Sequence, residues 1–246
     1  MIPLDHRQPV LFDRSRADEP YIPLPSHHDN IRLTPWRVED VDAVLPILNH
    51  PDVYPRLVGP AYPYTREHAQ LWFEGQSKLF EPDRGYFTGD EAAPLRQGKF
   101  FDYTPMCVIR EVQPDGSQIF LGVVDLVRSS FGGETDSATK EQLIKKNRGK
   151  TAGDPTIVYM VGDYLAASHH GKGIMTAAVR ELIRSWGVPY MRIRLVHAAV
   201  MEGNVGSRRV FEKLGFSFSG FIEGSVPTQG KRDEVMGEWF FQYTAE

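Results

Sequence analysis

Strand-like and helix-like segments alternate along the C-terminal third of the chain, and this alternation limits the fold more than any other feature. Runs rich in β-branched and aromatic residues, such as TIVYMVGDYL from Thr156, are typical of strands, whereas apolar residues spaced by three and four are typical of helices. Gly215 ends the last helical segment, because glycine readily takes the left-handed conformation after a helix. The predicted order is strand 156–165, helix 174–186, strand 191–200, helix 205–214, and strands from 216 and over 235–243. This order predicts an α/β protein in which helices pack on a mixed sheet.

The preceding part of the chain adds further elements and two long connections. The predicted elements are a strand from Ile31, a helix interrupted at Pro46, a helix that begins after Thr65, and a hairpin of strands around 114–116. Segments 81–103 and 128–155 are loop insertions, the second being basic with one short helix near 140–146. This basic segment either clamps an acidic ligand or is a solvated, mobile loop.

The domain organisation follows from the distribution of proline. Residues 1–30 contain five prolines and are predicted to form an N-terminal arm. Residues 31–246 are predicted to form one domain that carries both insertions near 81–103 and 128–155. No internal repeat of solenoid length is present in the sequence.

Composition excludes several classes of protein. The chain has 246 residues and a formal net charge of −4, so it lacks the basic surplus typical of nucleic-acid binding. The apolar runs are far shorter than the roughly 20 residues that a membrane span requires, and neither a membrane nor a nucleic acid is a predicted partner. Cys107 is the single cysteine, which excludes an intrachain disulfide and favours a cytoplasmic location.

The junction between the strand ending near 165 and the helix from 174 has the sequence SHHGKGIM. Two glycines let backbone amides approach an anion, and the helix N-terminus adds partial positive charge. The junction is therefore a candidate phosphate site, although its spacing matches neither the Walker loop nor the dinucleotide fingerprint. Two glycines in a tight connection can also do nothing more than turn the chain.

A second motif, NVGSRRVFEKLGF from Asn204, decides between these interpretations. Together the two motifs resemble the GNAT acyltransferase superfamily, closest to the branch that includes the ribosomal-protein N-terminal acetyltransferases. The resemblance covers roughly residues 31–243. It implies a mixed, mostly antiparallel central sheet flanked by helices, and acetyl-CoA or coenzyme A as the bound cosubstrate.

The resemblance also implies which residues bind the cosubstrate. His170 stands where the family has Gln or Arg, and Met175 replaces a small residue and is expected to narrow the turn. The backbone amides of 170–175 are expected to bind the pyrophosphate, and any side chain at Gly173 would approach its oxygens. The cosubstrate-binding residues implied in this way are Leu165, His170, Gly171, Lys172, Gly173, Ile174, Met175, Asn204 and Ser207.

Catalytic residues are implied in part by resemblance and in part by chemistry. Many family members place a tyrosine acid where this chain has Phe211, so Ser207 is the candidate donor of a proton to the leaving sulfur. Ser207 and Asn204 also have structural interpretations, as a small packing residue and as a helix N-cap. Attack by an amine requires loss of a proton, and Asp163 and Glu223 are the first candidates for a base, ahead of Asp125 and Glu202. A backbone amide near 164–166 is expected to bind the thioester oxygen.

The functional hypothesis is an N-acetyltransferase that moves an acetyl group from acetyl-CoA to a primary amine by direct attack in a ternary complex. The acceptor is a small amine or a protein N-terminus, and homodimers are common in the superfamily. The alternatives are a noncatalytic acyl-CoA sensor or scaffold and a protein of this fold that binds no coenzyme A. The histidine pairs 27–28 and 169–170 lack accompanying ligands at metal-binding spacing, so no metal is predicted.

Overall fold

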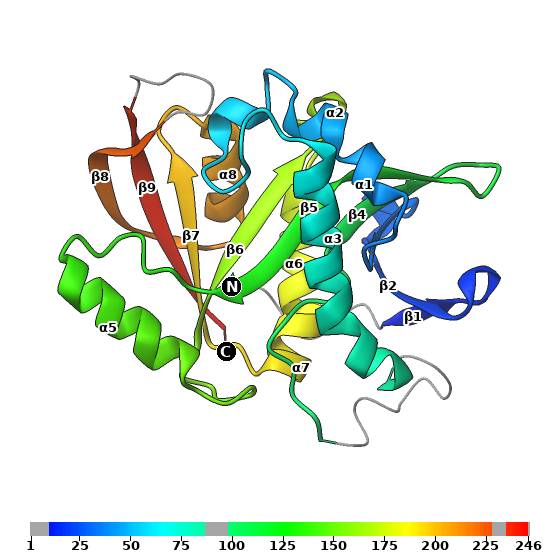
Figure 1. The fold of residues 1–246 in the computed structure, drawn as a ribbon, viewed down its shortest axis with the longest axis horizontal. Coiled ribbons are helices and arrows are strands. Elements are labelled where there is room, and N and C mark those ends of the chain that lie inside the picture. The colour runs from blue at the N-terminus through cyan, green and yellow to red at the C-terminus, as the bar shows by residue number, and fades with distance from the viewer. Residues whose placement is uncertain (1–9, 87–97, 228–234, 246) are drawn as a thin grey trace.

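The computed structural model describes residues 10–86, 98–227 and 235–245. Its strands are β1 (Leu11–Asp13), β2 (Glu19–Pro23), β3 (Ile31–Thr34), β4 (Val108–Val112), β5 (Gln118–Arg128), β6 (Val158–Leu165), β7 (Leu195–Met201), β8 (Ser217–Pro227) and β9 (Val235–Thr244). Within the described residues they form one sheet in the order β1-β2-β3-β4-β5-β6-β7-β9-β8 (Figure 1). Every neighbouring pair is antiparallel except β6 and β7, which are parallel. The predicted mixed, mostly antiparallel sheet is confirmed.

Helices cover both faces of this sheet (Figure 1). They are α1 (Asp40–Ala43), α2 (Leu45–Leu48), α3 (Arg66–Phe80), α5 (Ser137–Arg148), α6 (Ile174–Leu182), α7 (Val188–Met191) and α8 (Val205–Lys213). A π-helical turn, Ile183–Gly187, joins α6 to α7. As predicted, the helical segment containing Pro46 is divided in two, and Thr65 caps α3 by accepting from the amide of His68. None of the helices in the described residues is long and apolar enough to cross a bilayer.

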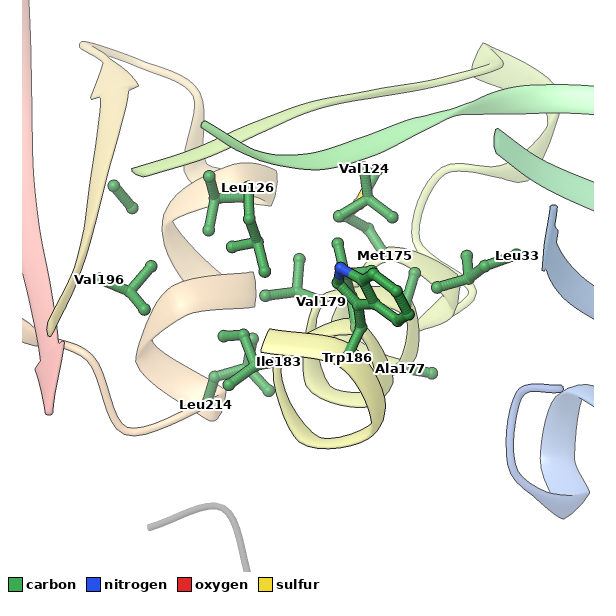
Figure 2. Packing of buried hydrophobic residues seen from close by; sticks show 14 of the residues in the cluster. Leu33, Val124, Leu126, Met175, Ala177, Val179, Ile183, Trp186, Val196 and Leu214 are labelled. Atoms are coloured by element: carbon green, nitrogen blue, oxygen red, sulfur yellow. The ribbon is translucent and has the colours of Figure 1, made fainter. Parts of the chain in front are cut away.

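Two apolar cores pack on the sheet, one on each face. Leu121 and Val124 of β5 belong to the larger core with α6, whereas Phe120 and Val123 of the same strand belong to the smaller core with α1, α2 and α3. The spacing of three, rather than the two of regular alternation, goes with a register shift, since Ile109 and Arg110 of β4 pair with Gly122 and Phe120. Figure 2 shows the larger core, where the fully buried Trp186 lies among aliphatic side chains of α6 and the sheet. The sheet is therefore the middle layer of a three-layer molecule.

The predicted N-terminal arm is in part an extension of the sheet. Strands β1 and β2 pair with each other, and β2 pairs with β3 through Ile22 opposite Leu33. Ile22 and Leu24 are buried in the larger core, since alternate residues of this extended segment face the same side. Proline at 20, 23 and 25 favours extended backbone in a strand as well as in a free arm. Residues 1–9 of the predicted arm lie outside the described residues.

The basic insertion is more ordered than the sequence predicts. It contains the 12-residue helix α5, capped by Asp136, rather than a short helix in a mobile loop. Asn147 at the end of α5 is buried and bonds both the amide and the carbonyl of Val158 on β6, at 2.9 and 2.7 Å. These two bonds fasten the insertion to the sheet. Of the other predicted insertion, residues 87–97 lie outside the described residues.

The two parallel strands at the centre of the sheet diverge. Strand β6 pairs with β7 only from Val158 to Met160, although β6 continues to Leu165 and β7 continues to Met201. The gap opens next to the start of α6, which follows β6, and next to the start of α8, which follows β7. Both sequence motifs therefore meet at this gap.

Candidate active site

A cavity of about 930 Å³ is centred on the gap between β6 and β7. The ends of β5, β6, β7 and β9 form its floor, and α3 with the connection that precedes it covers one side. The turn before α6 and the first turns of α8 form the other side. The cavity therefore joins the two motifs to the face of the sheet covered by α3.

All but one of the residues predicted to bind the cosubstrate line this cavity. They are Leu165, His170, Gly171, Gly173, Ile174, Met175, Asn204 and Ser207. The exception is Lys172, which is exposed and does not line the cavity.

Left-handed glycines shape the turn before α6. Gly171 has φ of 74° and Gly173 has φ of 81°, and Gly173 is the N-cap of α6. A β-carbon built on Gly173 meets only the ring of His28, with Nε2 at 3.7 Å, so the space above this glycine is otherwise open. The first amides of a helix have no partner within it, and those of α6 face this space.

Two details of the predicted turn are corrected. The amide of His170 donates to the carbonyl of Ala167 at 3.2 Å, so free donors begin at Gly171 rather than at His170. The His170 ring instead reaches back, with Nε2 2.8 Å from the carbonyl oxygen of Leu165. Met175 does not narrow the turn, because its side chain is buried in the larger core (Figure 2).

Asn204 has both of the roles that the sequence allows. Its Oδ1 accepts from the amide of Ser207 at 3.2 Å, which makes it the N-cap of α8, and it also lines the cavity. Ser207 is half-buried and lines the cavity one turn further along the helix. Phe211 is 1% exposed within the larger core, so this position contributes packing rather than chemistry.

The structure divides the four candidate carboxylate bases into two that line the cavity and two that do not. Asp163 and Asp125 line the cavity. Glu223 is exposed on β8 and Glu202 is exposed at the end of β7, and neither of them lines it. Glu223 is therefore too far from the gap to act as the base there, because β8 is the outermost strand and lies beyond β9.

Sequence reasoning missed two further carboxylates that line the cavity, that of Asp52 before α3 and that of Glu238.

Glu238 is the one beside the gap. It lies on β9 opposite Met201 of β7 and lines the cavity while half-buried. Burial raises its pKa, and the charge of Lys140 opposes that shift. A charged residue within the otherwise uncharged run VMGEWFF is the signal that could have found it.

Burial also shifts the pKa values of the two aspartates. It raises the pKa of Asp163 to about 6. Burial raises the pKa of Asp125 as well, although the hydroxyl of Thr104 and the amide of Leu126, the latter 2.7 Å from Oδ1, favour its charged form. The side-chain carboxyl of Asp163 makes no hydrogen bond or ion pair with any residue that the structure describes, so it is free to exchange a proton near neutral pH.

The backbone of β6 offers a donor at the gap. The amide of Ala166 donates to the carbonyl of Leu121 at 2.7 Å, which removes Ala166 from the predicted donors at 164–166. Bonded and nonbonded residues alternate in an antiparallel ladder, so Leu165, opposite Gly122, directs its amide away from β5 and toward the gap. Among the described residues, no group of three or more potential metal ligands lies together.

The comparison with known proteins agrees with this geometry. A family model described as an acetyltransferase (GNAT) domain matches residues 30–217, which is well over half of the chain. The chain belongs to the GNAT family of acetyltransferases. This membership confirms the predicted acyltransferase class, with acetyl-CoA as cosubstrate, and the family match starts one residue before β3.

Individual relatives of this GNAT chain are distant. The probable N-acetyltransferase YjcK of Bacillus subtilis (strain 168) is 40% identical over 70 residues, a match that spans 28% of this chain and 38% of that relative. The microcin C7 self-immunity acetyltransferase MccE, solved with acetyl-CoA and AMP, has a TM-score of 0.58 at 14% identity and covers 89% of this chain and 94% of its own. The ribosomal-protein-S5-alanine acetyltransferase of Vibrio fischeri has a TM-score of 0.57 at 15% identity over 87% and 93% of the two chains. At these identities the solved structures establish the fold alone.

Proposed function

We propose that this GNAT protein transfers an acetyl group from acetyl-CoA to a primary amine by direct attack within a ternary complex. One observation carries the proposal. An unpartnered carboxyl with a pKa of about 6, that of Asp163, lies in the cavity where β6 and β7 diverge, beside the two motif-bearing helix N-termini.

The chain offers a binding group for each part of acetyl-CoA. The free amides from Gly171 to Ile174 and the N-terminus of α6 bind the pyrophosphate. The pantetheine arm lies in the gap, where β6 has backbone groups that no strand satisfies, and Asn204 bonds it from the far side. Acetyl-CoA supplies the acetyl group as a thioester, which this arrangement directs into the cavity.

Three groups of the chain act on the reaction. Asp163 accepts a proton from the incoming ammonium, directly or through water, and so provides a nitrogen lone pair. The Leu165 amide donates to the thioester oxygen and stabilises the charge that develops on it. Ser207 donates a hydrogen bond to the departing sulfur, since Phe211 has no hydroxyl to offer, and the sulfur takes up the proton that the nitrogen loses as the amide forms.

The first test is a calorimetric titration with acetyl-CoA, followed by a screen for thiol release over amines and short peptides. We expect binding together with turnover. Ser207→Ala is expected to lower kcat by roughly tenfold or more while the Kd of acetyl-CoA stays within about twofold, because the hydroxyl acts only on the leaving group. Binding without thiol release from any acceptor would favour an acyl-CoA sensor, and absence of binding would refute the cosubstrate site.

A further inference from the structure

The charged residues through which the floor strands line the cavity are all acidic. They are Asp125 on β5, Asp163 on β6 and Glu238 on β9. The cationic lining side chains, including Arg56 and Arg209, come instead from the surrounding helices and turns. By strand alternation Asp125 and Glu238 lie on the face of the sheet away from α6, whereas Asp163, opposite Val124 of the larger core, lies on the α6 face. Acidic groups therefore border the gap on both faces of the sheet.

These floor carboxylates are not neutralised by the described part of the protein. None of the three lies within 4 Å of a described Lys, Arg or His nitrogen, and Lys140 acts on Glu238 only over a longer distance. Glu238 has no hydrogen-bond donor among the described residues either. A carboxylate that is partly desolvated without a partner is costly, and an arriving cation removes that cost.

The space between the carboxylates suits the apolar body of an acceptor. Gly162 lies opposite Asp125 in the β5–β6 ladder, and a β-carbon built on it meets nothing within 4 Å. Val127 lies opposite Met160 on the same face, and both line the cavity. This face of the floor thus offers an apolar surface, with open space above Gly162, and it is the face that also carries Asp125 and Glu238.

The reacting nitrogen cannot itself satisfy these carboxylates. It must give up a proton before it attacks the thioester, so it carries no net charge at the moment of transfer. Asp163 is occupied by that proton transfer in the proposed function. Asp125 and Glu238 then remain available for a positive charge that does not react.

We infer that the acceptor is a diamine-like molecule, with an apolar body and a second cationic group that binds the carboxylate of Glu238. This inference rests on the proposed acetyl transfer and names the substrate class of the same site. Asp125, which is 7% exposed and bonded to the Leu126 amide, adds to the negative field at the floor while Glu238 makes the direct contact.

The test compares three amines of one length that differ only at the far end: 1,6-diaminohexane, hexylamine and 6-aminohexanoate. We expect kcat/KM for the diamine to exceed that for hexylamine by roughly tenfold, well above the factor of two that follows from its two equivalent ends. The aminohexanoate is expected to be the poorest acceptor, because its carboxylate meets the acidic floor.

Two variants assign the preference to one residue. Glu238→Gln should reduce the ratio of diamine to hexylamine to about two, the value set by the two ends alone. Glu141→Gln, the same change at an exposed position on α5 outside the cavity, should leave the ratio unchanged.

The failure of this inference can be distinguished from failure of the proposed function. Acetylation of hexylamine and the diamine at equal rates, or a preference that survives Glu238→Gln, would refute the second-cation site and leave the acetyltransferase intact. Binding of acetyl-CoA without thiol release from any of the three amines would also overturn the inference. Only the loss of acetyl-CoA binding itself would overturn the cosubstrate site.

Discussion

At the scale of single residues, the carboxyl of Asp163 links stability to activity. The charged form is disfavoured by burial and has no described partner, and the pKa is raised from 3.8 to about 6. The unfolded chain therefore loses this proton at lower pH than the folded chain does, and the free energy of unfolding falls as pH rises from about 4 to about 6. Above pH 6 the stability of the folded protein is lowered by the full free-energy cost of burying the charged carboxylate.

Asp163→Asn should therefore stabilise the protein at neutral pH while it impairs catalysis. The difference between 3.8 and about 6 corresponds to a gain of up to roughly 3 kcal/mol in the free energy of unfolding at pH 7.5, and this gain should vanish near pH 4. We expect kcat to fall by roughly 100-fold as the base is removed. Urea unfolding at the two pH values and thiol-release kinetics measure both effects.

The wild-type pH profile is the control for this prediction. The acidic limb of kcat should lie near pH 6 in the wild type and should be absent from the residual activity of Asp163→Asn. A variant that is no more stable than the wild type at pH 7.5, yet retains an acidic limb near pH 6, would show that another group is the base.

At the scale of elements, the turn before α6 depends on the backbone of Gly173. Any other L-residue there is strained at φ of 81° by about 1–2 kcal/mol. Gly173→Arg also places a long side chain over the free amides where the pyrophosphate is proposed to bind. We expect roughly a 100-fold loss of acetyl-CoA affinity by calorimetry in addition to the loss of stability.

Gly116 provides the matched control for this strain. It has φ of 82° in the β4–β5 hairpin, and a β-carbon there meets nothing within 4 Å. Gly116→Arg should cost a similar 1–2 kcal/mol of stability with no change in acetyl-CoA affinity. Equal affinity losses in both variants would show that Gly173 has no special relation to the cosubstrate.

Local chemistry explains which elements were predictable from the sequence. The turn before α6 and the start of α8 depend on glycine conformation and an asparagine cap, which are encoded within a few residues. The placement of Glu238 opposite Met201, beside the gap, depends on pairing between distant strands, which no local pattern specifies. For the same reason the sequence could not separate Asp125 from Glu223, since both lie on predicted strands and only strand order brings one of them to the cavity.

At the scale of the whole molecule, a buried ion pair joins the helical layer above the cavity to the sheet. Arg110 of β4 and Asp40 of α1 are each 1% exposed, and the guanidinium donates to both carboxylate oxygens at 2.8 and 2.5 Å. Arg110 also donates to the hydroxyl of Thr34 on β3 at 2.7 Å. This network fixes α1 on the face of the sheet where α2 and α3 help to enclose the cavity.

Arg110→Met should therefore destabilise the molecule strongly, because it leaves the carboxylate of Asp40 buried without its cation. We expect a loss of about 3–5 kcal/mol in the free energy of unfolding, measured by urea denaturation. The exposed pair between Arg66 and Asp42, 2.9 Å apart on the same helical layer, is the control, and Arg66→Met should cost less than about 1 kcal/mol. Similar losses in the two variants would mean that the helical layer is held by its apolar contacts alone. A much larger loss in Arg110→Met than in Arg66→Met would show that the buried Arg110–Asp40 pair holds the helices that cover the cavity in place on the sheet.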